Sequence, residues 1–126
     1  MNHPESAIRL RDAIATRDPA VIAACFSEDY VTIAPQNPSL SFTGRDTVLR
    51  NWTAIIARMP DITAAILRSS VNGEDIWTEW DMRGTVSDGG PDALVGTAIW
   101  STDEGGLISE SRFYLAPVNR NAPRAF

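Results

Sequence analysis

The stretch "IWTEWDMRGTVSDGGPDALVGTAIW", residues 76–100, predicts two consecutive antiparallel strands. Apolar and polar residues alternate through its first half, which is the period of an extended chain with one buried face. Turn-forming residues at Asp88–Pro91, which read DGGP, separate the two halves. A β-hairpin is therefore expected here, and the rest of the chain is interpreted around it.

Two further turn signals occur at similar intervals, at Asn72-Gly73 and at Asp103–Gly106. The Asn-Gly pair is typical of a two-residue hairpin turn, because both residues tolerate a positive φ. These signals divide residues 61–116 into four expected strands, joined one after another as a meander.

The residues before position 61 show a different apolar period, near 3.6, which is typical of amphipathic helices. Asp18 and Pro19 predict the N-cap and first position of a short helix. Thr43 and Asp46 have the spacing of a capping box, which predicts the start of the longest helix. The expected elements are helices at residues 4–16, 18–25 and 43–59, a strand at 30–35 and a loop at 36–44.

Helices followed by consecutive hairpins predict an α+β domain, with the helices on one face of an antiparallel sheet. Residues 1–126 are expected to form a single domain, because the chain is short and no linker divides it. Residues 117–126 are expected to form a polar C-terminal tail.

The composition excludes several classes of function. The hydrophobic content is 44%, the formal net charge is -5, and the basic residues are scattered arginines without a lysine. This argues against nucleic-acid binding. No apolar run approaches the ~20 residues of a membrane span, and the chain does not open on a signal-peptide pattern. We therefore expect no membrane association and a cytoplasmic location.

Cysteine and histidine usage gives no sign of a cofactor. The only cysteine, Cys25, lies among apolar residues of an expected helix, which favours a buried thiol over a nucleophile. The only histidine, His3, lies near the N-terminus, so no metal-binding cluster is expected. A glycine-rich phosphate loop is also absent from the sequence. We expect neither a metal nor a cofactor.

Four phrases carry a resemblance to a known family: "RDPAVIAACFSEDYVTIAP", "FTGRDTVLRNW", "EWDMRGTV" and "VGTAIWSTDEGGLISESRFY". They resemble the SnoaL-like branch of the nuclear transport factor two-like superfamily, over residues 5–116. This superfamily includes ketosteroid isomerases, limonene epoxide hydrolases and polyketide cyclases. The resemblance implies a strongly curved sheet that forms a cone with the helices, around an internal pocket for an apolar ligand. Enzymes and non-enzymes share this fold, so function depends on the site.

The resemblance also implies which side chains face the pocket. Alternate residues of the last strand are expected inside it, and the matching positions are Ile108, Glu110, Arg112 and Tyr114. Strand parity extends this inward set, with Trp52 added from the longest helix. The further residues expected inside are Thr32, Ala34, Ile76, Thr78, Trp80, Met82, Val95, Thr97 and Ile99. The alternative is that the tryptophans fill the core and that Glu110 and Arg112 form a neutralising ion pair.

The known active sites of the family are not matched. A ketosteroid isomerase needs a carboxylate, a tyrosine and a protonated aspartic acid, and the matching positions hold Ala34, Leu10 and Thr97. The last aspartate of a limonene epoxide hydrolase would fall near Ala116, and Asp81 is expected to point outward. Neither mechanism is therefore expected.

Glu110 is the one carboxylate expected inside the pocket. As a base it would suit proton abstraction beside a carbonyl, with Arg112 stabilising the enolate and Tyr114 or Thr97 donating a hydrogen bond. A close arginine would lower the pKa of the carboxyl and weaken the base unless burial offset the effect. The prediction is a cofactor-independent isomerase, cyclase or lyase that acts on an apolar oxygenated metabolite, polyketide-like or terpenoid-like.

A non-catalytic ligand-binding or accessory module is the alternative, and it uses the same pocket without turnover. An unpaired Glu110 that is reachable from the pocket mouth would favour the enzyme. Under either hypothesis the ligand is a small apolar organic molecule. The expected ligand-binding residues are Trp52, Trp80, Tyr114, Thr78, Thr97, Ile99, Thr32 and Met82.

The same parity places Trp77, Trp100 and Phe113 on the outer face of the sheet. Monomers seldom expose such a patch, and superfamily members commonly dimerise through this surface. We therefore expect a homodimer whose interface includes these aromatic residues. The alternative is that helices or the C-terminal tail cover the face within one chain.

Overall fold

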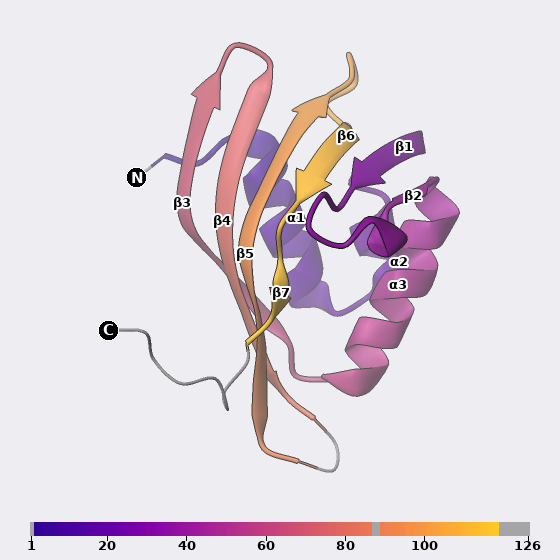
Figure 1. The fold of residues 1–126 in the computed structure, drawn as a ribbon, viewed down its shortest axis with the longest axis vertical. Coiled ribbons are helices and arrows are strands. Elements are labelled where there is room, and N and C mark those ends of the chain that lie inside the picture. The colour runs from indigo at the N-terminus through magenta and orange to yellow at the C-terminus, as the bar shows by residue number, and fades with distance from the viewer. Residues whose placement is uncertain (1, 87–88, 119–126) are drawn as a thin grey trace.

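A computed structural model describes residues 2–86 and 89–118. The helices lie together on one side of a curved sheet, as the α+β prediction requires (Figure 1). The expected turn at 88–91 is only partly covered by the described residues, and most of the expected tail at 117–126 lies outside them.

The N-terminal helices form where the sequence predicts them. Helix α1 spans Glu5–Thr16, and helix α2 spans Pro19–Ala23. The carboxylate of Asp18 caps α2 by accepting a hydrogen bond from the backbone N–H of Ala20 at 2.9 Å. Both helices bury their apolar residues against the sheet and against each other.

Helix α3 spans Arg45–Arg58 and begins without the expected capping box. Its N-cap is Gly44, at φ +95°, and no side chain caps it. Thr43 instead pairs with Val31 in the sheet, so its backbone belongs to a strand rather than to a helix start. The turn from strand to helix falls on Gly44, because a glycine adopts a positive φ without strain.

One mixed sheet contains seven strands, in the order β2-β1-β6-β5-β4-β3, and β7 pairs with β5 (Figure 1). The strands are β1 Phe26–Ile33, β2 Phe42–Thr43, β3 Thr63–Asn72, β4 Asp75–Thr85, β5 Pro91–Thr102, β6 Ile108–Phe113 and β7 Ala116–Pro117. The predicted four-strand meander is β3 to β6. The sheet is mixed and not antiparallel throughout, because β1 runs parallel to β6.

A β-bulge in β6 changes which of its side chains face inward. Thr102 pairs with Ile108, but the next residue along β5, Ser101, pairs with Glu110. Ser109 is therefore an extra residue, and the side chains that follow it change faces. Ser111 is buried at 9% exposure as a result.

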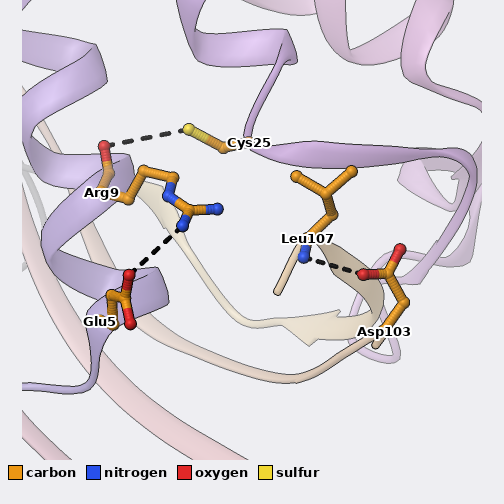
Figure 2. A network of polar contacts seen from close by, with 5 residues as sticks. All are labelled: Glu5, Arg9, Cys25, Asp103 and Leu107. Atoms are coloured by element: carbon orange, nitrogen blue, oxygen red, sulfur yellow. Dashed lines mark hydrogen bonds and ion pairs between the residues drawn. The ribbon is translucent and has the colours of Figure 1, made fainter. Parts of the chain in front are cut away.

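The turn before this bulge is held by Asp103. Its carboxylate accepts hydrogen bonds from the backbone N–H groups of Gly105 at 2.9 Å and of Leu107 at 3.0 Å. Figure 2 shows the contact with Leu107. Figure 2 also shows an ion pair within α1, in which Nη2 of Arg9 lies 3.4 Å from Oε1 of Glu5. The β5–β6 connection is thus fixed locally, by side-chain contacts with its own backbone.

The prediction that Cys25 is buried is confirmed. Its thiol is covered, and Sγ lies 3.9 Å from the Arg9 carbonyl oxygen (Figure 2). Burial raises the pKa of the thiol, and the positive charge of Arg9 opposes the effect. Cys25 is therefore a core residue that stays protonated at neutral pH.

The inward face of β5 is also opposite to the one expected. Thr78 pairs with Ala98, and Trp80 pairs with Gly96. Residues directly opposite each other share a face of the sheet. Because Thr78 and Trp80 are buried, the even-numbered residues of β5 must also face inward, and Trp100 is buried. The expected inward set of Val95, Thr97 and Ile99 is wrong.

Gly96 permits the close approach of β6 and β7 to β5. It has φ +142°, and an added Cβ would lie only 2.9 Å from the Cα of Leu115. Beside it, the backbone N–H of Tyr114 donates to the Thr97 carbonyl at 2.7 Å. The chain after the bulge can therefore follow β5 down the cavity wall.

In residues 2–86 and 89–118, no helix has the length and apolar character needed to cross a membrane.

Candidate functional site

A cavity of about 350 Å³ lies between the helices and the sheet. Its lining comes from α1, α3 and most strands of the sheet. The lining residues are Leu10, Phe26, Tyr30, Thr32, Leu40, Phe42, Val48, Asn51, Trp52, Ile55, Arg58, Met59, Trp80, Met82, Leu94, Ala98, Trp100, Ser111, Phe113, Leu115 and Pro117. A volume of this order lies at the lower end of the range for small-molecule sites.

Aromatic rings form much of the wall. The rings of Trp80 and Trp100 lie 6.3 Å apart, tilted by 32°. The indole N–H of Trp80 donates to Thr78 at 2.8 Å, and that of Trp100 donates to Ser6 at 2.9 Å. Both indole donors are engaged by the protein, so these side chains offer a ligand apolar surface only.

Three hydroxyl groups form a cluster within this apolar wall. The Tyr30 hydroxyl and the Thr32 hydroxyl each lie 2.5 Å from the Ser111 hydroxyl. All three side chains are buried. Thr32 pairs directly with Ser111 across the parallel β1–β6 ladder, and the bulge at Ser109 turns Ser111 inward. Strand register therefore assembles the cluster.

The cluster has one donor more than it uses. Three hydroxyls carry three protons, and its two internal hydrogen bonds use two of them. Within residues 2–86 and 89–118, these hydroxyls make no third hydrogen bond of good geometry, although the Thr32 hydroxyl lies close enough to Tyr30 to act on its phenol. The third proton is available to an acceptor in the cavity. A buried donor without an acceptor costs about 1–3 kcal/mol.

Tyr30 is the most acidic member of the cluster. Burial raises the pKa of its phenol, and the neighbouring hydroxyls of Ser111 and Thr32 oppose the rise. The phenol is therefore neutral at physiological pH, and it acts as a hydrogen-bond donor rather than a base.

Arg58 is the one charged side chain among the described residues that line the cavity. It lies at the end of α3, is 55% exposed and donates through Nη2 to Asp92 Oδ2 at 2.6 Å. Asp92 is the more covered partner, with 16% of its side chain exposed. No carboxylate or imidazole lines the cavity in the described part of the chain, so the site lacks a side chain suited to act as a general base there.

The expected catalytic pair lies outside the cavity. Glu110 and Arg112 are exposed on the outer face of the sheet, because the bulge reverses their direction. Among the described residues, no ion pair joins them, so the alternative expectation of a neutralising pair is also wrong. Tyr114 is exposed as well, at 40%. The predicted position of all three is wrong for the same reason.

The other expected ligand-binding residues divide into three groups. Trp52, Trp80, Thr32 and Met82 line the cavity. Thr78 is buried behind the wall, where it accepts the hydrogen bond from Trp80. The residues on the outer face, against expectation, are Thr97 and Ile99.

Sequence reasoning missed Tyr30, Ser111, Trp100 and Arg58 as cavity residues. Tyr30 lies two residues before Thr32 in β1 and so shares its face, which means that its inward direction could have been predicted from the sequence. The inward direction of the Ser111 and Trp100 side chains depends on the strand register and on the bulge, and neither has a clear signal in the sequence. Arg58 lies in the last turn of α3, where a cation is common in any helix, so its position carries no signal of a site.

In the parts of the chain that the structure describes, no group of Cys, His, Asp or Glu side chains could hold a metal ion.

Comparison with known families agrees with this architecture. Residues 7–111 match the model of the SnoaL-like domain. The chain belongs to the SnoaL-like family. No curated protein matches it.

Several solved structures share the fold at low sequence identity. A Catenulispora acidiphila protein with a ketosteroid isomerase-like fold, in complex with trimethylamine, has a TM-score of 0.77 and 18% identity, over 90% of this chain and 86% of that chain. The Mycobacterium tuberculosis protein RV0760c, in complex with estradiol-17beta-hemisuccinate, has a TM-score of 0.71 and 18% identity, over 86% and 89%.

A third similar structure is the epoxide hydrolase/cyclase-like enzyme SalBIII, described for pyran ring formation in salinomycin. It has a TM-score of 0.75 and 12% identity, over 89% of this chain and 88% of that chain. At these low identities, the TM-scores show a shared fold alone.

Proposed function

We propose that the cavity binds an apolar small molecule that carries an acceptor oxygen, such as a ketone, and that the Tyr30–Ser111–Thr32 cluster holds this oxygen. The observation that carries the proposal is the unused hydroxyl proton in a largely apolar wall. A ligand oxygen would satisfy that donor, while the ligand body would bury apolar surface against the tryptophan rings.

Binding is the function that the geometry supports best. The isomerase, cyclase or lyase predicted from Glu110 requires a base inside the cavity, and the described lining residues include no carboxylate or imidazole. Proteins of similar fold, crystallised with trimethylamine or estradiol-17beta-hemisuccinate, support a small-molecule ligand.

A cyclase is the second candidate, because the neutral Tyr30 phenol could polarise a carbonyl without any base. Such a substrate would bring its own nucleophile, and the cavity would hold it near the polarised carbon. The likeness to SalBIII supports this candidate at the level of the fold.

A pair of matched ligands tests the proposal. 2-Acetylnaphthalene carries a ketone, and 2-ethylnaphthalene has a similar shape without the oxygen. We expect the protein to bind the ketone about tenfold more tightly, since one hydrogen bond contributes about 0.5–1.5 kcal/mol net and the satisfied donor adds to it. Quenching of tryptophan fluorescence measures both affinities.

The triple variant Tyr30→Phe, Thr32→Val, Ser111→Ala removes every hydroxyl of the cluster and keeps the shape of the wall. All three changes are needed, because any hydroxyl left alone still has a proton to donate. The preference for the ketone should disappear in this variant. Tyr114→Phe is the matched control, since that phenol lies on the outer face. Equal binding of the two naphthalenes by the wild type would refute the proposal.

We also propose a homodimer through the outer face of the sheet, with a revised interface. Trp77 is exposed there at 45%, and Leu67 beside it at 50%. Trp100 and Phe113, expected in this interface, line the cavity instead. Both signs of charge are present on the same face, in Glu110 and Arg112. A two-fold axis would let each carboxylate meet the arginine of the other copy.

The cytoplasm remains the expected location of the protein.

A further inference from the structure

We infer that the natural ligand carries a carboxylate or similar acidic group, and that Arg58 holds this group at the mouth of the cavity. This inference rests on the proposed function, because it concerns the other end of the same ligand. Arg58 is the one charged residue that lines the cavity within the described residues, and nearly the whole remaining wall is apolar.

Arg58 has donors to spare for a ligand. A guanidinium carries five N–H donors in a planar fork, and the contact with Asp92 uses Nη2 alone. No other acceptor lies within hydrogen-bonding distance of Arg58 in the part of the chain that the structure describes. The remaining donors therefore suit a second carboxylate, which an arginine binds by two parallel hydrogen bonds.

Asp92 positions the guanidinium. Its side chain is mostly covered, and its Oδ1 accepts from the backbone N–H of Ala93 at 2.8 Å while Oδ2 receives Arg58. Asp92 thus anchors the Arg58 guanidinium on one side, and about half of the Arg58 side chain remains exposed to solvent. Asp92 also repels an incoming anion, so its charge lowers the affinity that Arg58 provides.

The hydroxyl cluster and Arg58 lie toward opposite ends of β5. Ser111 pairs with Trp100, whereas the Arg58 partner Asp92 lies eight residues away along the same strand. Eight residues of strand span roughly 26 Å, and side chains and sheet curvature shorten the gap between the functional groups. In Figure 1, α3 accordingly ends well away from β1 and β6. The two polar ends select an elongated ligand with an acceptor oxygen at one end and an acid at the other.

The test uses the elongated 6-(6-acetylnaphthalen-2-yl)hexanoic acid and its methyl ester, which differ in charge at one end and share the ketone at the other. We expect the wild type to bind the acid about fivefold more tightly than the ester, as one partly exposed charge-assisted contact allows. Added salt should reduce this preference and leave ester binding unchanged.

Two substitutions make the prediction specific to this residue pair. Arg58→Gln should abolish the preference for the acid and leave ester affinity within about twofold. Asp92→Asn should strengthen acid binding severalfold, since it removes the competing negative charge and keeps the shape. Arg50→Gln, on an exposed turn of the same helix, is the matched control and should bind as the wild type does.

Equal affinity for acid and ester in the wild type would overturn the inference and leave the ketone site intact. A preference for the acid that survives Arg58→Gln would also overturn it, because the anion would then be held elsewhere. Failure to bind the acid and the ester, together with failure to bind 2-acetylnaphthalene, would overturn the proposed function as well.

Discussion

Individual side chains decide what this cavity can hold. Tyr30, Thr32 and Ser111 hydrogen bond to one another and retain one spare proton, whereas the indole donors of Trp80 and Trp100 are engaged by the protein. The other lining residues with polar groups, Asn51, Trp52 and Arg58, are less buried, so the hydroxyl cluster is the polar group of the buried part of the wall. That combination favours recognition of one oxygen atom within an apolar molecule.

At the same scale, Gly96 is predicted to be intolerant of any side chain. Gly96→Ala should lower the free energy of unfolding by about 3 kcal/mol, because a strained φ and a backbone overlap with residues 114–115 add together. Urea denaturation measures the change.

Gly73→Ala is the control for Gly96→Ala. Gly73 also has a positive φ, of +63°, but nothing lies within 4 Å of an added Cβ. Its cost should stay near 1 kcal/mol, the conformational contribution alone. Equal costs at the two positions would show that the close approach of the chain at Gly96 does not constrain the fold.

At the scale of elements, Asp61 joins the turn after α3 to the end of β4. Its carboxylate accepts a hydrogen bond from the backbone N–H of Thr85 at 2.7 Å. This bond lowers the pKa of Asp61 below its ordinary value of 3.8, and the nearby Arg17 acts in the same direction. The ionised form is therefore preferred in the folded protein.

A lowered pKa contributes stability that is present above the unfolded pKa and lost as the pH falls through the folded pKa. Wild-type stability should therefore drop as the pH falls below about 3.8. In Asp61→Asn this part of the acid dependence should be absent. Thermal melting at several pH values measures it, with Asp12→Asn on the exposed face of α1 as control. Identical acid profiles for wild type and Asp61→Asn would contradict the assignment.

The elements also show what sequence could and could not predict. The helices, the meander and the Asp18 cap follow from local signals, which act within a few residues. The direction of the Glu110 and Arg112 side chains does not follow from local signals. It depends on one extra residue, Ser109, in the pairing of β5 with β6. Alternation predicts faces only while the register is unbroken.

The sequence did not show which face of β5 points inward, and the reason is a different one. Apolar residues occupy both of its faces, and its central inward position is Gly96, which has no side chain to mark the pattern. The cavity as a whole was predictable from the family resemblance and from Trp52 and Trp80. The chemistry of its polar groups required the register.

At the scale of the whole molecule, the outer sheet face is predicted to join two copies. Trp77→Glu should convert a dimer into a monomer at low micromolar concentration, because a charge would be buried in the apolar part of the contact. Light scattering measures the change. Val21→Glu, on the surface of α2, is the control and should stay dimeric. A monomeric wild type would contradict this interface.

The central claim is that the hydroxyl cluster donates a hydrogen bond to an oxygen of the bound ligand, and the carbonyl stretch of bound 2-acetylnaphthalene in the infrared spectrum tests it most directly. A hydrogen bond lowers this frequency relative to the value in a hydrocarbon solvent. We expect a lowered frequency in the wild type and in Tyr114→Phe, and a return to the hydrocarbon value in the Tyr30→Phe, Thr32→Val, Ser111→Ala variant. A hydrocarbon-like frequency in the wild-type complex would contradict the account.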